Sequence, residues 1–141
     1  MDFEPVIAAL QAAFPDVDLA PRAAPLDDTF VTIPAEGLRR AVTLLLEDWQ
    51  LRHLSTITGL DTGEYVELLY HFWHTHGLTL RVTLPYAALR IASITDLIPG
   101  AAFYEREIVE MFAVTVDGLP DPRPFLLPDD WDGGAPLRKG V

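Results

Sequence analysis

Apolar residues recur at helical spacing in three segments of the chain. In residues 3–14 they stand three and four positions apart, with Asp2 as a candidate cap and Pro15 as a stop. Residues 36–49 place leucine, valine, alanine and tryptophan on one face, which predicts the principal core helix. Residues 101–112 repeat this spacing. The pattern therefore predicts three amphipathic helices.

A second pattern, rich in β-branched and aromatic residues, predicts strands. Residues 29–33 alternate and end at Pro34, which cannot donate to a strand ladder. Residues 51–84 predict three consecutive strands, with turn signals at 61–63 and 75–77. Strands joined by tight turns form an antiparallel meander. We therefore expect an α+β fold in two layers, with helices on one face of a mixed or largely antiparallel sheet.

The remaining segments predict the domain organisation. Residues 15–28 hold three prolines and four aspartates and are typical of a linker. After Pro85 the chain predicts a short helix-like piece that ends in the run SITDLIPG. From residue 119 onward, prolines and aspartates surround a few apolar residues. We expect one core domain over 1–118, followed by an extended Pro-rich C-terminal docking arm over 119–141.

Composition and charge exclude several classes of function. Half of the 141 residues are hydrophobic, which is enough for one hydrophobic core. The apolar surface that remains outside this core indicates contact with a partner. The formal net charge of -11 has the wrong sign for nucleic acid or anionic lipid, so we expect neither nucleic-acid binding nor direct membrane insertion. The absence of cysteine removes thiolate metal sites, cysteine-ligated iron–sulfur clusters and cysteine nucleophiles. The N-terminal segment lacks a signal-peptide pattern, so we expect a soluble, intracellular protein.

The histidines are the most metal-like group in the chain. Strand alternation would place His74 and His76 on one face near a turn, with His71 close by. A zinc or iron site needs about three or four ligands, and Glu64 and Glu67 are the other candidates. We favour solvent-exposed structural histidines over a metal site because the candidate ligands are too few.

Three glutamates in the last predicted helix offer candidate acid–base chemistry. Helical phase places Glu107 and Glu110 on the solvent side and Glu105 at the border of the apolar face. A carboxylate at that border needs a partner such as an arginine or a backbone amide. We favour a structural ion pair over catalysis for Glu105. Neither a serine-nucleophile elbow nor a glycine-rich phosphate loop occurs.

Four blocks in the C-terminal third carry a family resemblance. They are residues 105–112 (EREIVEMF), 118–123 (GLPDPR), 126–131 (LLPDDW) and 136–139 (PLRK). Their order and spacing resemble the signature of the respiratory complex I 30 kDa subunit family, which in bacteria is the C subunit of NADH-quinone oxidoreductase. Looser similarity extends upstream to about residue 30. The same domain type occurs in related subunits of membrane-bound [NiFe] hydrogenases and formate hydrogenlyases.

The chain departs from the family pattern at four places. Ala113 stands where the family usually has glycine, Leu119 where it has histidine, and Pro124 where a second arginine is common. A basic, acidic and aromatic continuation would also be expected after residues 140–141. These departures suggest a divergent or specialised member.

The resemblance implies a non-catalytic structural subunit of the hydrophilic arm of an NADH:quinone oxidoreductase. Such a subunit binds no cofactor or metal and has no catalytic residues. Its partners are a large subunit with the quinone or nickel–iron site and a neighbouring iron–sulfur subunit. It would be cytoplasmic and peripheral to the inner face of the cell membrane through its complex. The alternatives are the hydrogenase setting, a stand-alone enzyme using Glu105 and Glu107, and an unrelated binding module.

The resemblance also assigns residues to partner docking. In the arm, Phe125, Leu127 and Trp131 would be apolar anchors, with Arg123, Arg138 and Lys139 as candidate ion-pair partners at the rim. Packing of the arm against its own domain is an equally open alternative. The signature and docking residues are Glu105, Arg106, Glu107, Glu110, Met111, Phe112, Pro120, Asp121, Arg123, Leu127, Pro128, Trp131, Pro136, Leu137, Arg138 and Lys139.

Overall fold

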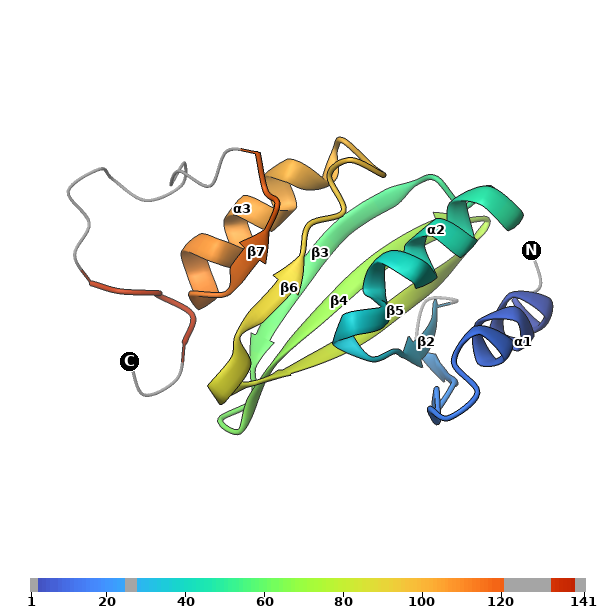
Figure 1. The fold of residues 1–141 in the computed structure, drawn as a ribbon, viewed down its shortest axis with the longest axis horizontal. Coiled ribbons are helices and arrows are strands. Elements are labelled where there is room, and N and C mark those ends of the chain that lie inside the picture. Colours follow the sequence, from blue (N-terminus) through green and yellow to red (C-terminus); the bar gives the residue numbers. More distant parts are fainter. Residues whose placement is uncertain (1–2, 25–27, 121–132, 139–141) are drawn as a thin grey trace.

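The computed structural model describes residues 3–24, 28–120 and 133–138 (Figure 1). The helices are α1 (Glu4–Ala13), α2 (Leu38–Asp48) and α3 (Ala101–Phe112), with short 3-10 turns η1 (Ala35–Gly37) and η2 (Tyr86–Ala88). The strands are β1 (Arg22–Ala24), β2 (Asp28–Thr32), β3 (Leu54–Asp61), β4 (Tyr65–His74), β5 (His76–Pro85), β6 (Arg90–Ala92) and β7 (Thr115–Asp117).

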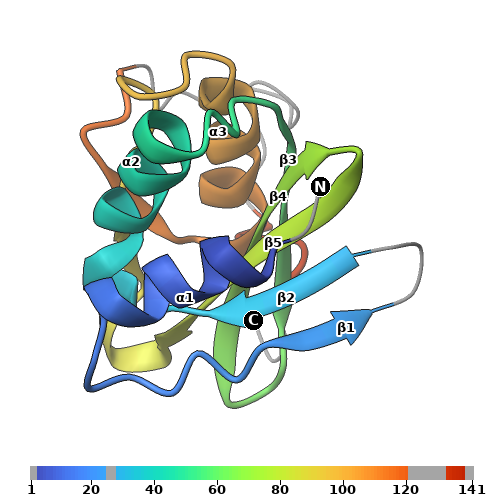
Figure 2. The same cartoon turned by 90° about the vertical axis from the view of Figure 1, so that its right-hand side faces the viewer.

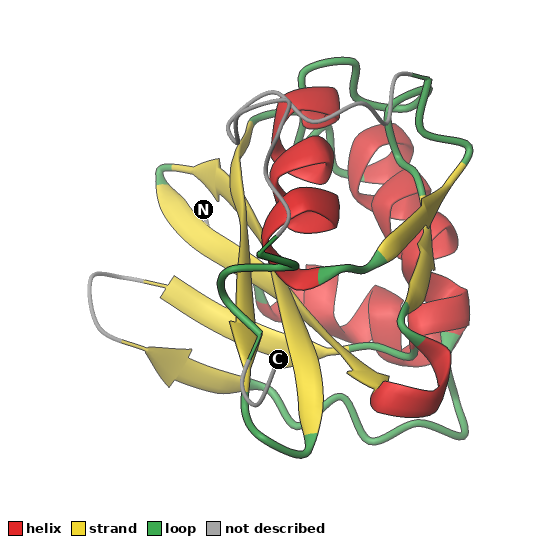
Figure 3. Ribbon diagram, turned by 90° about the vertical axis from the view of Figure 1, so that its left-hand side faces the viewer, coloured by secondary structure: helices red, strands yellow, loops and turns green. Residues whose placement is uncertain are grey.

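The main sheet has five strands in the order β1-β2-β5-β4-β3. Strands β3, β4 and β5 form the antiparallel meander that the turn signals predict. Strand β2 joins the other side of β5 in parallel, and β1 pairs with β2 in the antiparallel sense. The three helices lie on the same face of this sheet (Figures 2 and 3). The prediction of an α+β fold with a mixed sheet and helices on one face is confirmed.

The core lies between the sheet and its helices. On β4 the fully buried side chains include Tyr70 and Phe72, and on α2 they include Leu38 and Leu45. Helix α3 packs closely on β3 because Gly59 has no side chain: a Cβ there would lie 2.4 Å from the Phe112 ring. The helix predicted over residues 36–49 corresponds to η1 followed by α2, and the helix predicted over residues 101–112 corresponds to α3.

The segment between β5 and α3 differs from the predicted helix-like piece. Residues 86–88 form only the turn η2, and residues 90–92 form β6, which pairs in parallel with β7 beside α3 (Figure 1). A local pattern could not reveal this pair because the two strands are separated by a whole helix. The connection is possible because α3 ends at Ala113 in the left-handed conformation, with a φ of 58°.

The predicted linker over residues 15–28 is partly structured. Leu19 is fully buried, and its carbonyl oxygen accepts a hydrogen bond from the Thr32 amide. Residues 22–24 then form the edge strand β1. At the start of the chain, Phe3 is the N-cap of α1 and makes no side-chain capping bond, whereas the predicted cap Asp2 lies outside the described residues.

The second hairpin is tighter than the predicted turn. Thr75 alone connects the strands, at a φ of 64°, so that His74 and His76 stand opposite each other in the ladder. Gly77 belongs to β5 rather than to the turn. A Cβ at Gly77 would lie 2.9 Å from an Asp28 carboxylate oxygen, so this glycine allows β2 to approach.

Candidate interaction site

Glu105 on α3 is a buried residue that connects the helix to the segment that follows β6. Only 1% of the residue is exposed. Its carboxylate accepts hydrogen bonds from the Ser93 hydroxyl at 2.7 Å, the Ile94 amide at 3.0 Å and the Thr95 hydroxyl at 2.6 Å. The predicted backbone-amide partner is therefore present. The predicted ion pair is not found among the described residues, since two hydroxyl groups take the place of an arginine.

Arg39 on α2 binds the same segment from its other side. Its guanidinium donates to the Ser93 carbonyl oxygen at 2.7 Å and to both carboxylate oxygens of Asp96 at 2.7 and 2.8 Å. The hydrogen bond from Arg39 lowers the pKa of Asp96. Both side chains are largely exposed, so the pair contributes little to stability and mainly sets geometry. Together with Glu105, Arg39 fixes residues 93–96 between α2 and α3.

The other two glutamates have different surroundings. Glu107 is exposed, as predicted, whereas Glu110 is only 9% exposed, so the prediction of a solvated Glu110 was wrong. Helix α3 is covered on more than one side: it packs on β3 and β7, and residues 137 and 138 bond to the carbonyl groups of its last turn. A single apolar stripe therefore underestimates how much of this helix is buried. Glu105 is buried and Glu107 is exposed, so the two carboxylates of α3 have different surroundings.

The C-terminal segment is attached to the core by a second buried carboxylate, Asp61 at the end of β3. The Asp61 side chain is 0% exposed, and Arg138 donates to it from Nε at 2.9 Å with 13% of its own side chain exposed. The Gly63 amide and the Tyr86 hydroxyl also donate to Asp61. The Arg138 guanidinium lies over the Tyr86 ring, 4.8 Å from its centre. Arg138, predicted as a docking arginine, is thus bound within its own domain.

Backbone contacts extend this attachment to α3. The Leu137 amide donates to the Met111 carbonyl oxygen at 2.9 Å. Leu137 itself is 53% exposed, and Tyr86 is 40% exposed. No sequence pattern indicated the partnership of Asp61 and Arg138, because the two residues are 77 positions apart and the pattern around Asp61 is that of a turn.

The remaining signature residues divide into described and undescribed positions. On α3, Arg106 and Met111 are half-buried and Phe112 is buried. Pro120 and Pro136 are exposed. The residues that lie outside the described part of the chain are Asp121, Arg123, Phe125, Leu127, Pro128, Trp131 and Lys139.

His71 belongs to a hydrogen-bonded row on the sheet, whereas His74 and His76 lie opposite each other at the hairpin. His71 bonds to Thr58 from Nε2 at 3.0 Å and to Thr79 from Nδ1 at 2.9 Å. The Thr79 hydroxyl donates to Asp28, so it accepts from His71, and Nδ1 must therefore carry the ring proton. Burial lowers the pKa of His71, and the negative charge of Asp28 partly opposes this shift. Burial therefore favours the neutral form of the ring, which bonds to two hydroxyl groups.

The other candidate ligands are elsewhere. Glu67 is paired with Arg81, and Glu64 is exposed. Across residues 3–24, 28–120 and 133–138, three or more histidine, aspartate or glutamate side chains do not gather as a metal site would require. Within that same part of the chain, none of the helices has the length and apolarity needed to cross a membrane.

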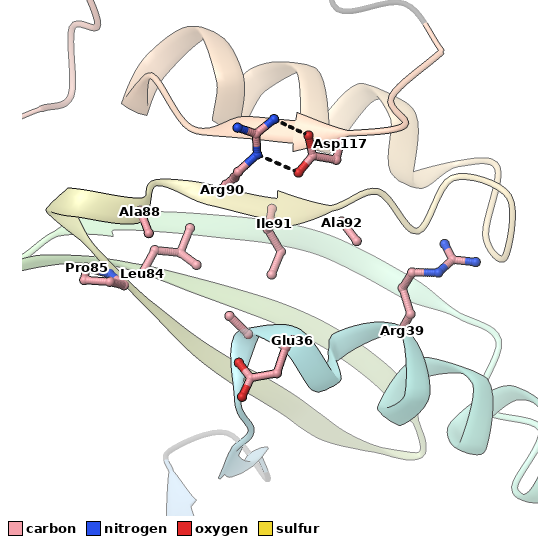
Figure 4. Close-up of a pocket in the computed structure, with 10 residues that line it drawn as sticks. Glu36, Arg39, Leu84, Pro85, Ala88, Arg90, Ile91, Ala92 and Asp117 are labelled. Atoms are coloured by element: carbon pink, nitrogen blue, oxygen red, sulfur yellow. Dashed lines mark hydrogen bonds and ion pairs between the residues drawn. The ribbon is translucent and has the colours of Figure 1, made fainter.

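A hollow of about 490 Å³ lies between β6 and the start of α2 (Figure 4). Leu84, Ile91 and alanine side chains form most of its wall, and Glu36, Arg39, Arg90 and Asp117 stand around it. A second hollow of about 450 Å³ shares Arg39, Ala92 and Asp117 with the first and continues to Pro120. The sequence did not predict this surface, because β6 was not recognised as a strand.

The fold and these contacts define a small α+β domain in which the buried carboxylates of Asp61 and Glu105 hold structural elements together. Comparison with known proteins agrees with this description. The family model for the respiratory-chain NADH dehydrogenase, 30 Kd subunit, matches residues 31–141. The chain therefore belongs to this family.

Individual proteins support the assignment. The C subunit of NADH-quinone oxidoreductase from Roseiflexus castenholzii is 34% identical over 149 residues, which cover 100% of this chain and 84% of that protein. The C/D subunit from Gluconacetobacter diazotrophicus is 36% identical over 122 residues, covering 76% of this chain and 20% of the longer protein. A chain of the membrane-bound sulfane sulfur reductase, an archaeal respiratory membrane complex, has the same fold: TM-score 0.81, 22% identity, and coverage of 96% and 83%.

Proposed function

We propose that this chain is a non-catalytic structural subunit of the hydrophilic arm of an NADH:quinone oxidoreductase. Family membership carries the proposal, because the match extends over residues 31–141 and the Roseiflexus relative is similar along the whole chain. The subunit holds the large subunit next to its electron-supplying neighbour, so that the distances between their cofactors stay constant. The chemistry belongs to the other subunits, and the complex keeps this chain at the inner face of the membrane.

The contacts of the described residues support a structural role. Glu105, the most buried glutamate, already accepts three hydrogen bonds, and Asp61 is occupied by Arg138, Tyr86 and the Gly63 amide. Carboxylates bonded in this way stabilise a fold and have little capacity left for acid–base work. The stand-alone enzyme that uses Glu105 and Glu107 is correspondingly disfavoured.

The large subunit is the partner that the relatives favour. The name of the Gluconacetobacter protein gives it as a C/D subunit, and only a fifth of it matches this chain. A single polypeptide that joins C-type and D-type parts requires the two to lie near each other in its complex. The arm over residues 119–141 is part of the proposal as the segment that docks. Leu137, exposed beside the anchored Arg138, is the described apolar residue best placed for that contact.

The equivalent subunit of an energy-converting [NiFe] hydrogenase or formate hydrogenlyase complex is a second candidate. It is kept as a candidate because this fold also occurs in a chain of an archaeal respiratory membrane complex that is named for sulfane sulfur rather than for NADH. The composition of the complex that contains this chain distinguishes the two settings.

The test is purification of the assembled complex through an affinity tag on the full chain. We expect stoichiometric large and iron–sulfur subunits, with NADH:quinone reductase activity that is lost when the chain is deleted and restored when it is returned. Hydrogenase-type subunits would assign the second candidate. Catalytic turnover by the purified chain alone, or a fully active complex without it, would overturn the structural role.

A further inference from the structure

Within the described part of the chain, strand β6 is paired along one edge, with β7. In the parallel ladder with β7, the register places Ile91 opposite Val116, and the flanking bonds join Thr115 to Leu89 and Ser93 to Asp117. In such a ladder, alternate residues direct both backbone groups to the same neighbour. The N–H and C=O groups of Arg90 and Ala92 therefore point away from β7, and they form no hydrogen bonds with the described residues. An edge of this kind is a template for another strand.

A groove runs along this open edge. The hollows of about 490 and 450 Å³ share Arg39, Ala92 and Asp117 and therefore lie next to each other, the first reaching Pro85 and the second Pro120. Figure 4 shows β6 along one wall and η1 with the start of α2 along the other, with Ile91 and Leu84 directed between them. A strand advances about 3.3 Å per residue, so an added segment of about three residues would match the open groups.

The charges beside the groove indicate the character of its occupant. Arg90 is bound by both carboxylate oxygens of Asp117, at 2.7 and 2.9 Å, and Arg39 is bound in the same way by Asp96. Both arginines are thereby neutralised. Glu36 is exposed and forms no ion pair with any residue that the structure describes. The groove thus carries one uncompensated negative charge, on a chain whose net charge is -11.

We propose that the groove and the open edge of β6 bind an extended segment of a partner subunit that carries a lysine or arginine facing Glu36. The segment adds to β6 as a third strand, so that backbone hydrogen bonds provide the affinity and the apolar wall and Glu36 provide the selectivity. This inference rests on the proposed function, because the segment belongs to a subunit of the same complex.

Amide hydrogen exchange on the full chain, alone and within the purified complex, tests this inference. In the free chain the Arg90 and Ala92 amides should exchange faster than that of Ile91. In the complex we expect their exchange to slow by at least about tenfold. A complex that assembles without this protection would overturn the strand addition and leave the proposed function standing. Failure of the wild-type chain to assemble at all would overturn both.

Two substitutions test the backbone and the charge separately. Ala92→Pro removes an N–H that faces the groove and keeps the ladder to β7, so we expect assembly to weaken by about tenfold, with Ala92→Ser as the control that retains the N–H. Glu36→Lys should weaken assembly by about fivefold, whereas Glu47→Lys, at an exposed position on α2, should not. The melting temperature of each variant shows whether it folds. If Ala92→Pro does not fold, the comparison of Glu36→Lys with Glu47→Lys tests whether the partner segment binds in the groove.

Other occupants of the groove predict different results. Protection that appears in the isolated chain and rises with its own concentration would assign the edge to a second copy. Protection in the isolated chain at every concentration would assign it to another segment of the same chain. Either result would overturn the proposal.

Discussion

At the scale of single residues, the carboxylate of Glu105 connects α3 to the segment after β6 by hydrogen bonds. Its three donors are a backbone amide and two hydroxyl groups from residues 93–95, of which Ser93 and Ile94 are buried and Thr95 is half-buried. Loss of one partner leaves buried donors unsatisfied, and each costs about 1–3 kcal/mol. The stabilising effect of Glu105 therefore comes from a complete set of hydrogen bonds rather than from an ion pair.

Substitution of Glu105 measures this contribution. We expect Glu105→Ala to lower the free energy of unfolding by about 3 kcal/mol and Glu105→Gln by about 1.5 kcal/mol, because an amide oxygen can still accept some of the bonds. Glu107→Ala, at an exposed position of the same helix, should change it by less than about 0.5 kcal/mol. Urea denaturation of the full chain provides the comparison. Equal effects at positions 105 and 107 would contradict a stabilising role for the buried hydrogen bonds of Glu105.

His71 makes stability depend on pH. Burial lowers its pKa in the folded chain below the unfolded value of about 6.5, so the unfolded chain binds the proton more readily. Stability from the neutral ring is therefore full above that unfolded value and falls as the pH decreases through it towards the folded pKa. We expect His71→Gln to reduce the loss of unfolding free energy between about pH 7.5 and about pH 5.5. His53→Gln, which removes an exposed imidazole, is the control, and an identical pH dependence in wild type and His71→Gln would refute the assignment.

At the scale of elements, the contact between β3 and α3 depends on a glycine. We expect Gly59→Ala to destabilise the protein by about 2 kcal/mol, because the new Cβ would overlap the Phe112 ring. Gly100→Ala, whose Cβ would meet open space, should cost less than about 0.5 kcal/mol. Thermal or urea unfolding distinguishes them. Partial recovery of stability in the double variant Gly59→Ala with Phe112→Leu would confirm that the ring is the cause, and no recovery would argue against it.

The helices and the meander were predictable because their signals are local. The apolar spacing of residues 101–112 corresponds to α3, and the turn signals at 61–63 and 75–77 mark the two hairpins. Strands β1 and β6 were missed because each is short and acquires its strand character from a distant partner. The same reason hid the groove, since an open edge exists only once the paired edge has formed.

At the scale of the whole molecule, Arg138 joins the C-terminal segment to a core residue 77 positions earlier. Removal of one partner from a buried ion pair costs more than an exposed pair contributes, because the remaining charge stays buried. Asp61 would retain its bonds from Tyr86 and Gly63, which limits this penalty. The attachment also holds one end of the proposed docking arm to the domain.

We expect Arg138→Ala to lower the free energy of unfolding by about 2 kcal/mol. Arg52→Ala, at an exposed position, should change it by less than about 0.5 kcal/mol. A double-mutant cycle with Asp61→Asn should give a coupling energy of at least about 1 kcal/mol. Additive effects of the two substitutions would show that the ion pair does not hold the segment in solution.

The sequence by itself determined the periodic elements, the tight turns and the family signature, because each of these depends on residues close together in the chain or on their order. Only the tertiary structure decided where the carboxylates find their partners, which strands lie parallel, and which strand edge is left open. Those outcomes depend on distances between segments that are remote in sequence, and hydrophobic periodicity contains no information about such distances.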